Sequence, residues 1–124
     1  MSQDRGKCVL IVEDDPITAA CLAELLQAEG YSTRMAEDGQ KGLDLLRQGA
    51  LPDLILLDLA MPIKDGAAFR AEQLEHASWR AIPTLILSAD AACESKNGLF
   101  AACAYIAKPL DIYRLLRVVE RRCG

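Results

Sequence analysis

Short apolar runs that each end at a polar residue constrain the fold of this chain more than any other feature. Residues 8–12 (Cys-Val-Leu-Ile-Val) and 54–57 (Leu-Ile-Leu-Leu) are continuous apolar stretches, and residues 84–87 repeat the pattern. Runs of this length and composition are typical of strands buried on both faces of a sheet. Residues 31–36 and 104–107 predict two further, shorter strands.

Helix signals separate the predicted strands. Asp15 provides a side-chain oxygen that can cap a helix, Pro16 follows where a missing N–H costs nothing, and Gly30 ends this helix. Asp38-Gly39 opens a second helix that stops near Gly49. Two more helices are predicted, over residues 67–76 and around Ile112, Leu115, Leu116 and Val119.

Alternating strands and helices predict an α/β fold, in which a parallel sheet carries helices on both faces. Ligands of such sheets gather beyond the carboxyl ends of the strands, where the strand order reverses. The residues just beyond the predicted strands are Glu13, Asp14, Asp15, Asp58, Ser88 and Lys108.

Size and charge limit the classes of protein to which this chain can belong. With 124 residues the chain fits one domain, and its 18 acidic against 14 basic residues give a formal charge of −4. We therefore expect no direct binding to nucleic acid and no attraction to anionic lipid. Residues 1–7 are polar and of mixed charge, which fits neither a signal peptide nor a membrane span and predicts a cytoplasmic location.

The cysteines argue against a disulfide framework or a zinc site, because they form an odd, scattered set without a CxxC pair. We interpret them as mostly buried free thiols in a reducing compartment. They are Cys8, Cys21, Cys93, Cys103 and Cys123.

Four motifs stand at the predicted strand ends, and together they carry a family resemblance. They are Val-Glu-Asp-Asp at 12–15, Asp-Leu-Ala-Met-Pro at 58–62 followed by Asp-Gly at 65–66, Ser-Ala at 88–89, and Tyr-Ile-Ala-Lys-Pro at 105–109. With these motifs the chain resembles the receiver domains of response regulators, such as the chemotaxis regulator, over nearly its whole length. The resemblance implies a flavodoxin-like (βα)5 doubly wound parallel sheet of order 2-1-3-4-5. It also implies a single receiver domain over residues 1–124, with its core at about 7–123.

Carboxylates gathered at one crevice repel one another, by about 4 kcal/mol for two charges roughly 4 Å apart at an effective dielectric near 20. An oxygen-only cluster without His or Cys suits a hard cation, and Mg²⁺ typically keeps several waters beside one or two carboxylates. The resemblance assigns direct ligation of Mg²⁺ to Asp14, Asp58 and the backbone carbonyl of Ala60, with Glu13 acting through water. Asp15 is interpreted as the helix cap.

The resemblance makes Asp58 the phosphoacceptor, and an aspartyl phosphate is a recognised covalent strategy. Lys108 would supply a second cation, aimed by a cis peptide at Pro109. Ser88 would donate its hydroxyl to the phosphoryl group, and Tyr105 would be the switch aromatic that turns inward as Ser88 moves.

The implied partners follow from this chemistry. The donor would be a sensor histidine kinase or a histidine phosphotransfer protein, and a downstream partner would bind the face formed by residues 90–104, the strand at 104–107 and the last helix. The resemblance also allows a phosphorylation-dependent dimer. The chain would be a switch that phosphorylates and dephosphorylates itself, rather than a turnover enzyme. The cognate kinase, the output pathway and any larger parent protein stay open at this point.

Two departures from the family concern signal lifetime and output. Ala60 lacks a polar side chain that could orient an attacking water, so the phosphate lifetime is expected to differ. Ser88 and Tyr105 are 17 positions apart, about two fewer than in the family, and Asn97-Gly98 interrupts the segment between them, so we expect a shortened helical region there. His76 is interpreted as a capping or surface residue rather than a relay histidine.

Three other classes of protein are alternatives to a phosphorylated receiver. A haloacid dehalogenase-type phosphohydrolase would carry a second acid two residues after the nucleophile, where this chain has Ala60. A flavin-binding electron-transfer protein would need a phosphate loop after the first strand, but residues 13–15 are three acids. A pseudo-receiver that binds partners without phosphorylation usually lacks an acid or the lysine, and all are present here.

Overall fold

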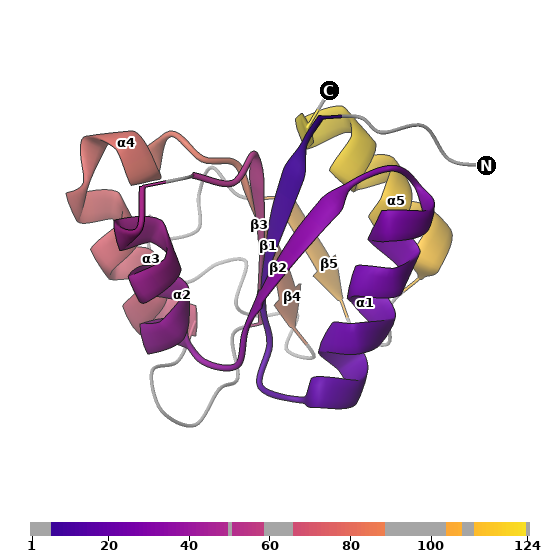
Figure 1. The fold of residues 1–124 in the computed structure, drawn as a ribbon, viewed down its shortest axis with the longest axis horizontal. Coiled ribbons are helices and arrows are strands. Elements are labelled where there is room, and N and C mark those ends of the chain that lie inside the picture. Colours follow the sequence, from indigo (N-terminus) through magenta and orange to yellow (C-terminus); the bar gives the residue numbers. More distant parts are fainter. Residues whose placement is uncertain (1–5, 50, 59–65, 89–103, 108–110, 124) are drawn as a thin grey trace.

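The computed structural model describes residues 6–49, 51–58, 66–88, 104–107 and 111–123 (Figure 1). The described elements are, in chain order, β1 (Cys8–Val12), α1 (Pro16–Ala28), β2 (Ser32–Ala36), α2 (Gly39–Arg47), β3 (Leu54–Asp58), α3 (Gly66–Glu75), α4 (Ala77–Arg80), β4 (Thr84–Ser88), β5 (Ala104–Ala107) and α5 (Ile112–Cys123).

The strands form one parallel sheet of order β2-β1-β3-β4-β5, which confirms the predicted fold class and strand order. Each predicted apolar run is a strand, with the second strand starting one residue later than expected. β1 and β3 are neighbours, and Val12 pairs with Leu57. The carboxyl ends of the two central strands therefore meet at one edge of the sheet.

Helices cover both faces of this sheet, with α1 and α5 on one side and α2, α3 and α4 on the other (Figure 1). Because side chains alternate along a strand, each central strand supplies both cores. Ile11 and Leu56 belong to the core beneath α1 and α5, whereas Leu10 and Ile55 belong to the core beneath α2 and α3. All four side chains are fully buried.

The predicted starts of the first two helices and the predicted end of the first are confirmed. Asp15 caps α1 by accepting a hydrogen bond from the N–H of Ile17 at 3.2 Å, and Asp38 caps α2 by accepting one from the N–H of Lys41 at 2.8 Å. Gly30, just past the end of α1, has a φ of 95°, a left-handed conformation that favours glycine.

The short helix α4 was not predicted. The expected helix over 67–76 is α3, which ends at Glu75, and α4 begins one residue after His76. His76 is exposed and makes no side-chain cap, but its ring stacks on buried Trp79 with 3.8 Å between the ring centroids. His76 is therefore an exposed surface residue at the N-cap position of α4, in agreement with the interpretation as a capping or surface residue.

The cysteines differ in part from the expectation. Within the described ranges Cys123 is buried, Cys8 is half-buried and Cys21 is exposed, and all three are free thiols. The prediction of burial is wrong for Cys21 because it lies on the solvent side of α1, next to Leu22, which points into the core. Cys93 and Cys103 lie outside the described residues. None of the described helices is long and apolar enough to cross a membrane.

Candidate functional site

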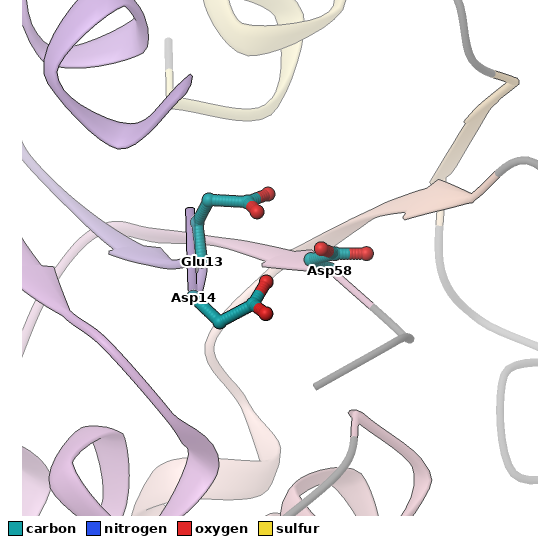
Figure 2. Close-up of side chains that lie close together, drawn as sticks. All are labelled: Glu13, Asp14 and Asp58. Carbon is teal, nitrogen blue, oxygen red and sulfur yellow. The ribbon is translucent and has the colours of Figure 1, made fainter. Parts of the chain in front are cut away.

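Three carboxylates gather at the carboxyl edge of the sheet. Glu13 and Asp14 follow β1 directly, and Asp58 is the last residue of the adjacent strand β3. One carboxylate oxygen of each residue lies within 4.8 Å of the others, and Figure 2 shows Glu13 and Asp14 directed toward the side of Asp58. The parallel register of β1 and β3 thus joins residues that are far apart in the sequence.

The three groups differ in their access to solvent. Glu13 is 4% exposed and Asp58 is 3% exposed, whereas Asp14 is exposed. Two unit charges at the separation of Glu13 and Asp58 repel by about 3 to 4 kcal/mol at an effective dielectric near 20. A cation at the cluster would remove this repulsion, and the exposed carboxylate leaves the cluster open to water.

Backbone hydrogen bonds position Glu13. The N–H of Glu13 donates to the carbonyl of Ala36 at the end of β2 at 3.0 Å, and Glu13 Oε1 accepts from the N–H of Asp15 at 3.2 Å. The side chain of Asp15 turns toward α1 instead, where Oδ2 accepts the hydroxyl of Thr18 at 2.6 Å. Its interpretation as the helix cap is confirmed.

A pocket of about 330 Å³ lies beside the carboxylates. Its lining residues are Glu13, Asp14, Pro16, Ala19, Met35, Ala36, Glu37 and Lys41. Lys41 forms an ion pair with Glu37, and the hydrogen bond and charge of Glu37 raise the pKa of Lys41. Sequence reasoning missed Met35 and Lys41, because neither belongs to a strand-end motif and only the folded arrangement of β2 and α2 brings them here.

The other predicted site residues are described in part. Ser88 ends β4, and the preceding Leu87 pairs with Asp58, so the backbone of Ser88 lies at the same edge of the sheet. Tyr105 lies in β5, where its backbone pairs with Ile86 of β4. Ala60, Lys108 and Pro109, and with them the predicted carbonyl ligand, second cation and cis peptide, lie outside the described residues, as does the segment between Ser88 and β5.

The donor set at this edge fits a hard divalent cation. It consists of oxygen atoms alone, two from buried carboxylates and one from an exposed carboxylate. Mg²⁺ prefers oxygen ligands and retains several waters, so it needs few protein ligands and an open side. Both conditions are met by the described residues.

Comparison with known proteins agrees with this geometry. Residues 9–120 match the family model of the response regulator receiver domain. The chain is 31% identical over 120 residues to the polar-differentiation response regulator DivK of Brucella anthropi, covering 95% of this chain and 97% of DivK. Its fold is similar to the chemotaxis response regulator CheY4 of Vibrio cholerae, with a TM-score of 0.81, 28% identity, and coverage of 94% and 98% of the two chains.

A third similar structure contains a metal. It is the receiver domain of the sensor histidine kinase PA1611 from Pseudomonas aeruginosa, in which a magnesium ion is coordinated in the active-site cleft. The TM-score is 0.82 at 27% identity, and 95% of this chain and 98% of that domain are covered.

Proposed function

The chain belongs to the response regulator receiver domain family of two-component systems, and from that premise we propose that Asp58 accepts a phosphoryl group from the phosphohistidine of a partner protein. The observation that carries the proposal is the meeting of Asp58 with Glu13 and Asp14 within 4.8 Å at the carboxyl edge of the sheet. The donor is a sensor histidine kinase or a histidine phosphotransfer protein.

The site residues would hold Mg²⁺ through Asp14, Asp58 and the backbone carbonyl of Ala60, with Glu13 acting through water. The oxygen-only donor set supports this assignment, as does the magnesium ion of the similar PA1611 receiver domain. When bound, Mg²⁺ supplies positive charge that offsets the repulsion between a carboxylate and an incoming phosphoryl group.

The transfer is a substitution at phosphorus. A carboxylate oxygen of Asp58 forms a bond to phosphorus, and the bond from phosphorus to the histidine nitrogen breaks, leaving its electron pair on the nitrogen. Lys108 places a second positive charge at the phosphoryl oxygens, and Ser88 donates its hydroxyl to one of them. Hydrolysis of the acyl phosphate returns Asp58 to a carboxylate, so the chain acts as a self-resetting switch rather than a turnover enzyme.

The output is a change in protein–protein contacts. As Ser88 moves toward the phosphoryl group, Tyr105 turns inward and alters the face that includes residues 90–104, β5 and α5. A downstream partner binds this face, and phosphorylation can also promote a dimer there. We place this activity in one domain with its core at about residues 7–123, in the cytoplasm.

The test is phosphorylation by a small donor. The purified chain is incubated with acetyl phosphate or phosphoramidate and Mg²⁺, and its intact mass is measured. The wild type is expected to gain one phosphate-sized mass increment that disappears when EDTA replaces Mg²⁺. Asp58→Asn is expected to gain none, whereas the matched control Asp44→Asn, an exposed aspartate on α2, should be labelled as the wild type is. A wild type that stays unlabelled while a known receiver is labelled would turn the assignment toward a pseudo-receiver.

A further inference from the structure

We propose that the outward face of α5 is a docking surface for an acidic segment of a partner protein, recognised by the arginine stripe formed by Arg114, Arg117 and Arg121. The inference deepens the proposed function and rests on it, because α5 belongs to the face at which a downstream partner is proposed to bind. What it adds is the chemistry of that partner.

The stripe follows from the helical periodicity of α5. Leu115, Val119 and Cys123, at spacing i, i+4 and i+8, are buried in the core that α5 shares with α1 (Figure 1). The arginines are exposed and stand at i, i+3 and i+7, which places them together on the opposite side of the helix. At a rise of 1.5 Å per residue the stripe is about 10 Å long.

An exposed aromatic side chain borders the stripe. Tyr113 is 82% exposed and lies one helical turn before Arg117. Tyrosine and arginine are enriched at the energetically dominant positions of protein interfaces. An exposed tyrosine ring beside three guanidinium groups therefore has the composition of a protein-binding surface.

The fold itself leaves the stripe's charge unused. The ion pairs among the described residues join Lys41 to Glu37, and Arg47 to Asp44 and Glu72, all outside α5. Within the same described set, no hydrogen bond or ion pair involves the side chains of Arg114, Arg117 and Arg121. Their guanidinium groups are therefore available to an external carboxylate.

Helix stability does not account for the stripe either. Arg121 lies in the last turn, where a cation interacts favourably with the helix dipole. Arg114 lies in the first turn, where its N–H donates to Asp111 Oδ1 at 3.2 Å. A cation in the first turn interacts unfavourably with the helix dipole. Arg117 has like charges at i−3 and i+4 and one opposite charge, Glu120, at i+3, but no ion pair joins them among the described residues. Contacts within the described part of the chain therefore do not explain Arg114 and Arg117.

The charge balance favours an acidic protein segment over a polyanion. Four arginines and one glutamate give α5 a net charge of +3, so the rest of the chain, by difference from −4, carries −7. A nucleic acid extending beyond the stripe would meet this negative surface. A bilayer would need an apolar helix face, and that face of α5 is buried. Carboxylates at i, i+3 and i+7 of a partner helix match the stripe in both sign and length.

The experiment compares designed probes on the full chain by fluorescence anisotropy. One probe is a labelled helical peptide with glutamates at i, i+3 and i+7, and the second has the same composition with its glutamates spread around the helix. The wild type is expected to bind the first more tightly than the second. The double variant Arg114→Glu/Arg117→Glu should bind it at least roughly tenfold more weakly, because exposed ion pairs are lost and like charges replace them. The matched control Arg47→Glu/Arg80→Glu makes the same charge change on α2 and α4, which cover the other face of the sheet (Figure 1), and should bind nearly as the wild type does.

Several outcomes would overturn the docking surface. The first two are an equal loss of peptide binding in the control variant and equal binding of the two peptides by the wild type. The third is tighter binding of a short DNA duplex than of the acidic peptide. The fourth is a dimer of the wild type, measured by light scattering, that the Arg114→Glu/Arg117→Glu change abolishes. Labelling by acetyl phosphate is measured on the same samples. A labelled wild type that ignores the acidic peptide refutes the docking surface alone, whereas an unlabelled wild type that binds it refutes the phosphoacceptor assignment and supports the docking surface.

Discussion

At the scale of single residues, the site brings two buried carboxylates close to a third, exposed one. Glu13 and Asp58 are almost inaccessible to water, yet they lie within 4.8 Å of each other and of Asp14. Buried like charges are costly unless a cation or hydrogen bonds compensate them. The cluster is therefore a position where a bound cation would raise stability.

Replacing one of these charges should stabilise the metal-free protein. We expect Asp58→Asn to raise the free energy of unfolding by about 1 to 2 kcal/mol in EDTA, because the gross repulsion of about 3 to 4 kcal/mol is partly offset by contacts that Asp58 makes. Urea denaturation followed by circular dichroism measures the difference. Millimolar Mg²⁺ should stabilise the wild type more than the variant, since the variant lacks one ligand.

The control for this prediction is Glu75→Gln, which removes an exposed carboxylate at the end of α3. It should change the free energy of unfolding by no more than about 0.5 kcal/mol. If Asp58→Asn lowered stability in EDTA, or if Mg²⁺ stabilised both proteins equally, Asp58 would not be a ligand in a repelling cluster.

At the scale of elements, α2 owes its position to a glycine. A Cβ atom added at Gly42 would lie 2.8 Å from Phe69 Cε2 of α3 and 3.2 Å from Val12 Cγ2 of β1. Alanine in place of glycine normally favours a helix by about 1 kcal/mol, but Phe69 is fully buried and has no room to yield. Gly42→Ala is therefore expected to lower the free energy of unfolding by about 1 to 3 kcal/mol, measured by urea denaturation.

A second substitution separates the clash from a general helix effect. Phe69→Leu in the Gly42→Ala background shortens the side chain that the new methyl group meets. The loss in the double variant should therefore be smaller than the sum of the two single losses, a coupling that a double-mutant cycle measures. Strict additivity would mean that α2 shifts freely and that Gly42 is not a contact residue.

A buried polar network ties α3 to the segment that contains α4. Gln73 Nε2 donates to the carbonyls of Trp79 at 2.9 Å and Ile82 at 3.3 Å, and Gln73 Oε1 accepts from Arg70 at 2.9 Å. Gln73 is fully buried, so Gln73→Leu leaves these groups short of partners and should cost about 2 to 3 kcal/mol of stability. Thermal unfolding measures the loss.

The comparison for this network is Gln40→Leu on α2, a half-buried side chain whose amide donates a hydrogen bond to Asp44 on the helix surface. Its effect should stay within about 0.5 kcal/mol. Equal losses at the two positions would indicate that the network around Gln73 contributes no more than a surface hydrogen bond.

The range of the contacts along the chain decides which elements could be predicted from the sequence. Strand runs, the caps Asp15 and Asp38 and the stop at Gly30 are local signals, and each stands where expected. Gln73 holds the segment from α4 to the start of β4 through hydrogen bonds to groups six to eleven residues away, and the approach of Phe69 to Gly42 spans two helices. No local pattern encodes such contacts, so they emerge only in the folded chain.

At the scale of the whole molecule, strand order decides what the site contains. Glu13, Asp14 and Asp58 could be predicted as neighbours because each follows an apolar run and parallel strands end at one edge. The pocket beside them could not be predicted, since Met35 and Lys41 reach it from β2 and α2 through packing. The exposure of Cys21 belongs to the same class, because it depends on which side of α1 faces the sheet.

The central strands also make the two cores one cooperative unit. Leu115 of α5 is fully buried in one core, while Trp79, the single tryptophan of the chain, reports on the other. β1 and β3 contribute alternate side chains to both cores. Leu115→Ala should therefore lower the urea midpoint that Trp79 fluorescence reports, although the two residues lie in different cores. The free energy of unfolding should fall by about 2 to 5 kcal/mol. Trp79 fluorescence and far-ultraviolet circular dichroism should give the same urea midpoint. In metal-free buffer, a circular dichroism midpoint that falls while the Trp79 midpoint stays at its wild-type value would mean that each face of the sheet unfolds separately.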